Sequence, residues 1–322
     1  MKIALLINRD NFEKYAAKAP PEWELIHMGN GVPDADAVIA TAAEVLVADA
    51  VMKIGSDIIG NMPTLKLIHS QGVAYNGIDL AAARDADIFV CNNPGINAQP
   101  VAEQTLLLIL SLLKNYSRFE AMVYDGRQME AKSECFRDGL PELCGMTVGL
   151  VGLGAIGSAL AERLRAFGCR LLYYSRTQKP DCGIEYAPLD ELYARSDIVS
   201  LHVPVTPETE NMINALSLSG FKNGALLINT ARGELTDYPA VLDALSSGQL
   251  GGFGTDTLSP EPVLSDNPFL TALPESLRHR VALSPHIAGI TAGSFVRTYA
   301  HIFRNIAALQ NGQRPDSIVN GI

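Results

Sequence analysis

Three strand-like runs in the second half of the chain are followed by side chains that could carry out chemistry. Arg232 follows the apolar run at 225–229, Glu261 lies between two prolines in the loop after 250–255, and His286 follows the run at 281–283. Ligands of open α/β sheets bind beyond the carboxyl ends of the strands. We therefore expect these three side chains to meet at one such edge.

The three residue types suit the reduction of a ketone that carries a carboxylate. Arg232 could hold the carboxylate through two hydrogen bonds and polarise the neighbouring carbonyl. His286 could give a proton to the developing alkoxide, and Glu261 would orient the imidazole. Each residue also has an ordinary alternative: Arg232 in a salt bridge, Glu261 solvated, and His286 in the core.

A glycine pattern provides an independent indication of a nucleotide. Gly152, Gly154 and Gly157 form a G-x-G-x-x-G between an apolar strand at 148–151 and a helix at 155–167. In that context Gly152 allows a tight turn, Gly154 lets the backbone approach a pyrophosphate, and Gly157 lets the helix pack close to the sheet. The helix N-terminus, beginning at Ala155 and Ile156, would bind the anion. A glycine-rich turn without a ligand is the alternative.

The end of the next strand bears on which dinucleotide is used. An acidic residue is expected there for the ribose 2′-hydroxyl of NAD, but the chain has Ser175, Arg176 and Thr177 after Tyr174. An arginine beside a small hydroxyl residue suits a 2′-phosphate. We favour NADP over NAD, and an exposed arginine with no selective role is the alternative.

The elements that would position these residues alternate between strand and helix. We expect strands at 2–8, 37–40, 65–70 and 87–92, helices at 78–84 and 99–115, and a loop-like stretch at 124–145. Strands at 147–151, 170–174, 197–201, 225–229, 250–255 and 281–283 follow, and a helix at 292–310 ends the chain. The predicted fold class is α/β, with two doubly wound parallel-sheet domains. A Rossmann cofactor domain at 99–288 is inserted in a flavodoxin-like substrate domain at 1–98 and 289–322, and we expect the site in the cleft between them.

Composition excludes several other classes of protein. The formal net charge of the 322 residues is −10, which argues against nucleic-acid binding. The five cysteines include no C-x-x-C pair, so neither a disulfide framework nor a metal site is expected. The apolar run at the N-terminus is too short for a signal peptide, and no run is long enough to span a membrane. We expect a cytoplasmic protein.

Taken together, the motifs resemble those of the D-isomer-specific 2-hydroxyacid dehydrogenases, the family that includes glyoxylate and hydroxypyruvate reductases. The resemblance runs from about Leu65 to the C-terminus. It is carried by the motifs at 93–95, 101–103, 152–157, 201–204, 206–209, 229–233, 260–262 and 285–289.

The resemblance implies a role for each matching residue. Arg232, Glu261 and His286 fall on the catalytic residues, and Val73 and Ala74 on the loop whose amides hold the substrate carboxylate. Asp256 matches the acid that meets the nicotinamide carboxamide. His202, Val203, Pro204, Thr209, Thr230 and Ala231 match positions along the cofactor groove. The resemblance also implies a homodimer formed through the long helix and the cofactor domain.

The expected reaction is hydride transfer between NAD(P)H and C2 of a small 2-oxo acid, giving a D-2-hydroxy acid. Two alternatives remain open: a formate- or phosphite-type dehydrogenase on the same scaffold, or a dinucleotide-sensing regulatory protein with little turnover. The sequence does not identify the 2-oxo acid or the physiological direction.

Overall fold

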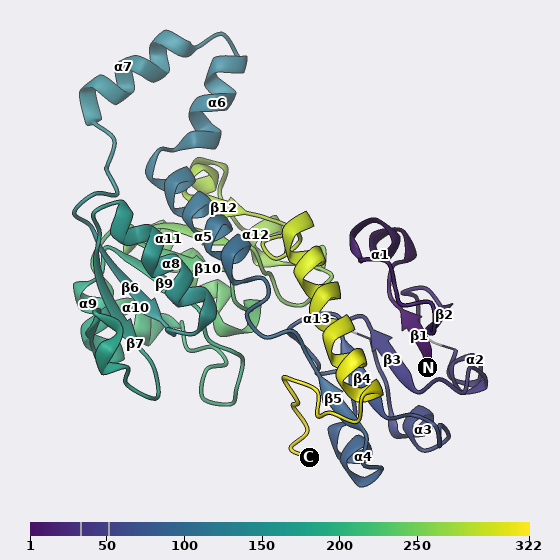
Figure 1. Ribbon diagram of the computed structural model, residues 1–322. Helices are drawn as coiled ribbons and strands as arrows, with labels where there is room; N and C mark the ends of the chain where they lie inside the picture. The colour runs from purple at the N-terminus through teal and green to yellow at the C-terminus, as the bar shows by residue number, and fades with distance from the viewer. Residues whose placement is uncertain (33, 51) are drawn as a thin grey trace. The chain divides into compact units, whose positions relative to one another are not determined.

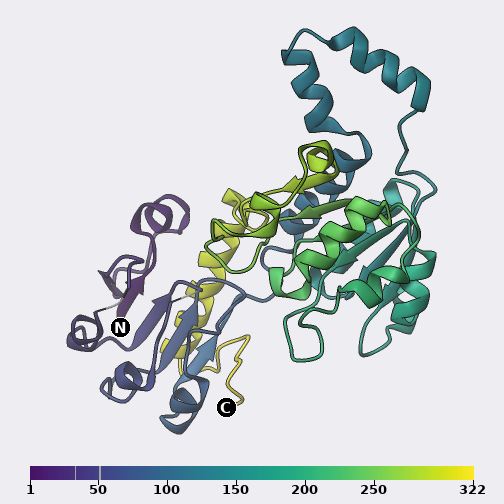
Figure 2. The same ribbon diagram turned by 180° about the vertical axis from the view of Figure 1, so that it is seen from behind.

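The computed structural model describes residues 1–32, 34–50 and 52–322. The chain consists of two compact units. Unit 1 comprises Met1–Asn97 and Ile290–Ile322, and unit 2 comprises Ala98–Gly289. Each unit contains one parallel sheet with helices packed on it, so the predicted α/β class is confirmed (Figures 1 and 2).

The sheet of unit 1 has the strand order β2-β1-β3-β4-β5. This is the doubly wound order typical of flavodoxin-like folds, with a switch point between β1 and β3. Its elements are β1 (Lys2–Leu6), α1 (Arg9–Tyr15), β2 (Glu24–His27), α2 (Ala35–Ala40), β3 (Val45–Ala48), α3 (Ser56–Ile59), β4 (Leu67–Ser70), α4 (Leu80–Asp85), β5 (Phe89–Cys91) and α13 (Ala292–Gln310).

One predicted strand of unit 1 is wrong. The residues at 37–40 belong to helix α2, and the strand comes later, at β3. Asp34 caps α2 by accepting hydrogen bonds from the amides of Asp36 and Ala37, so the chain enters a helix at this point. The apolar residues of 37–40 alone do not distinguish a short helix from a short strand.

Helix α13 joins the end of the chain to the core of unit 1. A capping box of Thr291 and Ser294 fixes its first turn. Tyr299, Ile302 and Ile306 on one face are almost fully buried and pack in the cluster that contains β1. The C-terminal segment thereby covers the sheet built by the N-terminal residues.

The sheet of unit 2 has the order β12-β11-β10-β9-β6-β7-β8, and every neighbouring pair is parallel. The order reverses between β6 and β9, which is where a Rossmann fold binds a dinucleotide. Its elements are α5 (Ala98–Leu113), α6 (Tyr116–Tyr124), α7 (Gln128–Asp138), β6 (Thr147–Val151), α8 (Ala155–Ala166), β7 (Arg170–Tyr174), η1 (Pro180–Cys182), β8 (Glu185–Tyr186), α9 (Leu189–Arg195), β9 (Ile198–Leu201), α10 (Ala215–Ser219), β10 (Ala225–Asn229), η2 (Gly233–Leu235), α11 (Tyr238–Ser247), β11 (Leu250–Thr255), α12 (Pro268–Thr271), η3 (Glu275–Arg280) and β12 (Val281–Leu283).

The stretch at 124–145, expected to be loop-like, contains the whole of helix α7 and the last residue of α6. Helices α6 and α7 form a hairpin that stands away from the sheet of unit 2 (Figure 1). Large apolar side chains on it remain exposed, including Tyr124 at 85% and Phe136 at 81%. A helix that does not pack on the core of its own domain lacks the buried stripe on which helix prediction depends. Among the described residues, no helix is long and apolar enough to cross a membrane.

Candidate active site

The glycine turn after β6 has the shape that a pyrophosphate requires. A Cβ on Gly152 would lie 2.4 Å from the carbonyl oxygen of His202, and one on Gly157 would lie 2.2 Å from that of Gly152. A Cβ on Gly154 would meet no atom of the described residues within 4 Å. Gly154 is the N-cap of α8 and no described side chain caps this helix, so its first amides are open to a ligand. The residues present therefore fit a bound dinucleotide.

His202 follows β9 on the other side of the switch point. Its Nε2 lies 2.9 Å from the Ser200 hydroxyl, and its buried Nδ1 has no partner among the described residues. Burial lowers the pKa of this imidazole to about 4, so it is neutral near pH 7. Thr209 shapes the loop that follows, because its hydroxyl donates to the Pro204 carbonyl at 2.7 Å.

The loop after β7 contains two cations, Arg176 and Lys179. Ser175 donates its hydroxyl to the Thr177 carbonyl at 2.6 Å, which closes the turn and leaves Arg176 exposed. Lys179 donates its ammonium to the carbonyl of Leu153, the residue between the first two glycines. Lys179 was not predicted from the sequence, although it lies only three positions after Arg176 and carries the same charge.

Glu261 and His286 are brought together. Glu261 Oε2 lies 2.6 Å from His286 Nδ1, and the two side chains remain 58% and 40% exposed. Nδ1 is therefore engaged, and Nε2 is the nitrogen left for another partner. His286 has a positive φ of 56°, a conformation that is unfavourable for most residues and must be maintained by its surroundings.

Asp256 provides that support. It is 1% exposed, and its backbone carbonyl accepts from the amide of His286 at 2.7 Å. Its carboxylate accepts from the amides of Ile287 and Ala288 at 3.0 and 2.8 Å and from the Ser284 hydroxyl at 2.5 Å. The carboxylate thus determines the path of the His286 loop, a role that sequence reasoning missed.

The turn that carries Arg232 packs against the same region. Asn229 forms this turn by accepting from the amide of Ala231 and donating to the Arg232 carbonyl. A Cβ on Gly233 would lie 2.5 Å from the amide nitrogen of Ser259, so the turn and the loop leading to Glu261 are in contact. The Arg232 guanidinium bonds only its neighbouring carbonyl among the described residues. Thr230 anchors the turn to α5 through Thr105 Oγ1 at 2.8 Å.

Val73 and Ala74 lie in unit 1, in the loop after β4. Within the described residues, neither of their amides has a hydrogen-bond acceptor. The carbonyls of the same two residues are engaged: Asn92 donates to that of Val73 at 2.7 Å, and the Ser70 hydroxyl to that of Ala74 at 2.6 Å. Adjacent free amides beside engaged carbonyls are what an anion-binding loop requires.

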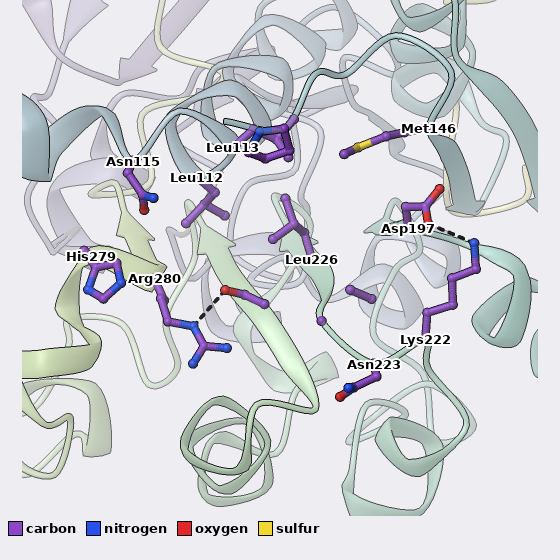
Figure 3. Close-up of a pocket in the computed structure, with 14 residues that line it drawn as sticks. Leu112, Leu113, Asn115, Met146, Asp197, Lys222, Asn223, Leu226, His279 and Arg280 are labelled. Atoms are coloured by element: carbon purple, nitrogen blue, oxygen red, sulfur yellow. Dashed lines mark hydrogen bonds and ion pairs between the residues drawn. The ribbon is translucent and has the colours of Figure 1, made fainter. Parts of the chain in front are cut away.

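A cavity in unit 2 lies away from these residues. Its volume is about 410 Å³, and Figure 3 shows Lys222 beside Asp197 and Arg280 pointing toward a backbone carbonyl. It opens at the amino ends of the strands, where Asp197 precedes β9 and Ala225 begins β10. The glycine turn, Arg232 and His286 all follow carboxyl ends. Lys222 pairs with Asp197 at 2.8 Å and Arg280 binds backbone carbonyls, so both of these cations in the cavity are already engaged.

A Rossmann sheet with an open phosphate turn, a histidine–carboxylate pair and an unpaired arginine beyond the same strand ends define a dinucleotide-dependent oxidoreductase. The comparisons with known proteins specify the class further. The sequence model of the D-isomer specific 2-hydroxyacid dehydrogenase NAD binding domain matches residues 106–288. The chain belongs to the D-isomer specific 2-hydroxyacid dehydrogenase family.

Relatives match over nearly the whole chain. A glyoxylate reductase of Korarchaeum cryptofilum is 31% identical over 99% of this chain and 96% of its own. One of Thermococcus litoralis is 35% identical over 94% and 88%. The crystal structure of D-lactate dehydrogenase from Aquifex aeolicus, complexed with NAD and lactic acid, is 30% identical, covers both chains completely and has a TM-score of 0.81. The family resemblance predicted from the motifs is confirmed, and with it an enzyme that uses a nicotinamide dinucleotide.

Proposed function

We propose that the protein reduces glyoxylate or a similarly small 2-oxo acid to the D-2-hydroxy acid with NADPH. The observation that carries this proposal is the 2.6 Å contact between Glu261 and His286 in a loop held by Asp256. Two relatives named glyoxylate reductases support the choice of a small substrate.

The residues divide the work according to their chemistry. When bound, the nicotinamide dinucleotide would supply the hydride for C2. Arg232 binds the substrate carboxylate and polarises the adjacent carbonyl, and the amides of Val73 and Ala74 donate hydrogen bonds to the carboxylate oxygens. His286 donates the proton from Nε2 to the developing alkoxide. Glu261 orients the imidazole through its 2.6 Å contact with Nδ1.

The proton-donor role is tested by His286→Asn. Asparagine tolerates the positive φ of this position better than alanine does, so the loop should keep its path. We expect kcat to fall by about 10²- to 10⁴-fold with little change in NADPH affinity, measured by nicotinamide fluorescence. His279→Asn, in the same unit, is the control and should leave kcat unchanged. Wild-type turnover in His286→Asn would refute the role.

A panel of substrates tests the rest of the proposal. Glyoxylate, hydroxypyruvate, pyruvate, bulkier 2-oxo acids, formate and phosphite are compared with NADPH and with NADH. We expect the smallest 2-oxo acids to give the highest kcat/KM. Oxidation of formate or phosphite with no 2-oxo acid reduction would favour the alternative dehydrogenases.

The preference for NADP is supported by Arg176 and Lys179, with Ser175 and Thr177 forming the turn between β7 and Lys179. Replacing either cation with alanine should weaken 2′,5′-ADP binding by about tenfold or more and leave 5′-ADP binding almost unchanged, as calorimetry would measure. Equal affinities of the wild type for both nucleotides would contradict the preference.

We also propose a homodimer that uses α5 and the α6–α7 hairpin. Leu107, Tyr124, Met129 and Phe136 expose between 58% and 85% of their surface, which is unusual for side chains of this kind. Sedimentation of the wild type and of Phe136→Glu would test the dimer, which the variant should weaken.

A cytoplasmic location is supported by five free cysteine thiols, as expected in a reducing compartment.

A further inference from the structure

A buried cluster of polar side chains lies beneath the loop of Val73 and Ala74 in unit 1. It consists of His69, Asn93, His301 and Asn305, which are 0%, 0%, 7% and 1% exposed. Asn93 follows β5, His69 lies on β4, and the other two are on α13. Polar groups in such positions are costly unless each is paired, so their hydrogen bonds specify the local structure.

Asn93 has only one consistent orientation. Its Nδ2 lies 2.9 Å from the Ser70 carbonyl and 3.0 Å from the Gln71 carbonyl, and both are acceptors. Its Oδ1 must therefore face His301, whose Nδ1 lies at 2.8 Å. His301 thus carries a proton on Nδ1 and donates it to Asn93.

His69 is also confined to one state. Its Nδ1 donates to the Ser70 carbonyl at 2.8 Å, and its Nε2 accepts from Asn305 at 3.0 Å. Asn305 is oriented in turn by the backbone of Asp316, which it contacts as both donor and acceptor. Burial lowers the pKa of His69 to about 3, which agrees with a neutral ring.

These bonds determine which way the loop presents its backbone. Asn93 engages the carbonyls of Ser70 and Gln71 with its side chain and that of Gly72 with its own amide, at 3.0 Å. With the preceding carbonyls engaged in this way, the amides of Val73 and Ala74 have no acceptor among the described residues. Asn93 itself is not one of the two donors, which are the backbone amides of Val73 and Ala74.

We propose that Asn93, oriented by His301, is a positioning residue for the binding of the substrate carboxylate. This inference rests on the proposed function, because it takes the amides of Val73 and Ala74 as the carboxylate site. It adds two residues that act through the loop backbone. Loss of either one lets the amides rotate, and the affinity for the 2-oxo acid falls while the proton donor is untouched.

The test compares Asn93→Ala with Asn320→Ala. Asn320 is also a fully buried asparagine of unit 1, and it donates to Ile88 and accepts from Val90, away from the loop. Both variants leave buried backbone groups unpaired, so their melting temperatures should fall similarly. Only Asn93→Ala should raise KM for the 2-oxo acid and Ki for oxamate, by about 10- to 100-fold, with kcat within about threefold.

His301 provides a second pair of variants that leaves Asn93 in place. His301→Leu removes the donor to Asn93 and should raise KM for the 2-oxo acid. His301→Asn restores a donor at the same distance along the side chain and should return KM most of the way to the wild-type value. These variants decide the question if Asn93→Ala does not fold.

Equal kinetic constants in the Asn93 and Asn320 variants, or no recovery in His301→Asn, would overturn the inference. A wild type that reduces no 2-oxo acid at all would instead overturn the proposed function, and the inference with it.

Discussion

Asp256→Asn should damage the enzyme through the loop of His286. The side chain keeps its size, but one carboxylate oxygen is replaced by an NH2 group. That group would face the backbone N–H of Ala288 or Ile287, which donates to the carboxylate in the wild type. Hydrogen bonds to a charged acceptor contribute about 1.5–3 kcal/mol each, and an orphaned buried donor costs about 1–3 kcal/mol. We expect a loss of about 3 kcal/mol, which corresponds to a fall in Tm of about 6–12 °C for a domain of this size.

The kinetic consequence follows from the backbone of His286. A left-handed conformation costs about 1–2 kcal/mol for a residue with a Cβ, so it persists only while the loop is held. Released, His286 should return to an ordinary φ and separate from Glu261. Misplacing the imidazole of His286 by about 1 Å would lower kcat by about 10²-fold.

The assay combines thermal unfolding, kcat at saturating cofactor and NADPH affinity from fluorescence. Ser284→Ala is the matched control: it removes one neutral donor from the same carboxylate, and should cost about 1 kcal/mol with little change in kcat. Unchanged kcat in Asp256→Asn would refute the supporting role. A fall in NADPH affinity as large as the fall in kcat would show that Asp256 acts by contacting the cofactor instead.

Two further predictions concern the glycine turn and acid stability. Gly154→Ala should fold with wild-type stability but bind NADPH at least tenfold more weakly, because its Cβ occupies open space in front of α8. Gly157→Ala should instead lower Tm, because its Cβ would overlap the carbonyl of Gly152. Differential scanning fluorimetry with and without NADPH separates the two effects, and equal behaviour of the two variants would contradict the fit of the glycine turn to a dinucleotide. His69 has a pKa of about 3 in the folded protein and about 6.5 in the unfolded chain, so its contribution to stability is complete above pH 6.5 and decreases as the pH falls toward 3. The loss should be up to about 1.4 kcal/mol per pH unit. Urea midpoints measured from pH 7 to 4 should therefore fall less steeply in His69→Asn than in the wild type, and parallel curves for the two proteins would contradict this.

The sequence predicted the elements whose pattern is strong. The strands of unit 2 are nearly continuous apolar runs because a parallel sheet is buried on both faces, and the glycine spacing identified the switch point. The short elements of unit 1 were harder to predict. Residues 37–40 form part of α2 because of the Asp34 cap, and α7 lacks a buried apolar face. In both places the deciding interaction is not visible in apolar periodicity.

The site shows a similar limit, because residue type does not reveal burial. Asp256 and Glu261 lie five positions apart, and both are carboxylates near His286. Asp256 is almost fully buried and accepts from a hydroxyl and two backbone amides, so its charge is already compensated and serves to fix the loop. Glu261 is 58% exposed, and among the described residues its carboxylate hydrogen-bonds only to the imidazole, so it remains available to that ring. The same chemical group therefore acts as structural support in one position and as the partner of the proton donor in the other, and the environment that separates the two roles arises only when the loops after β11 and β12 pack together.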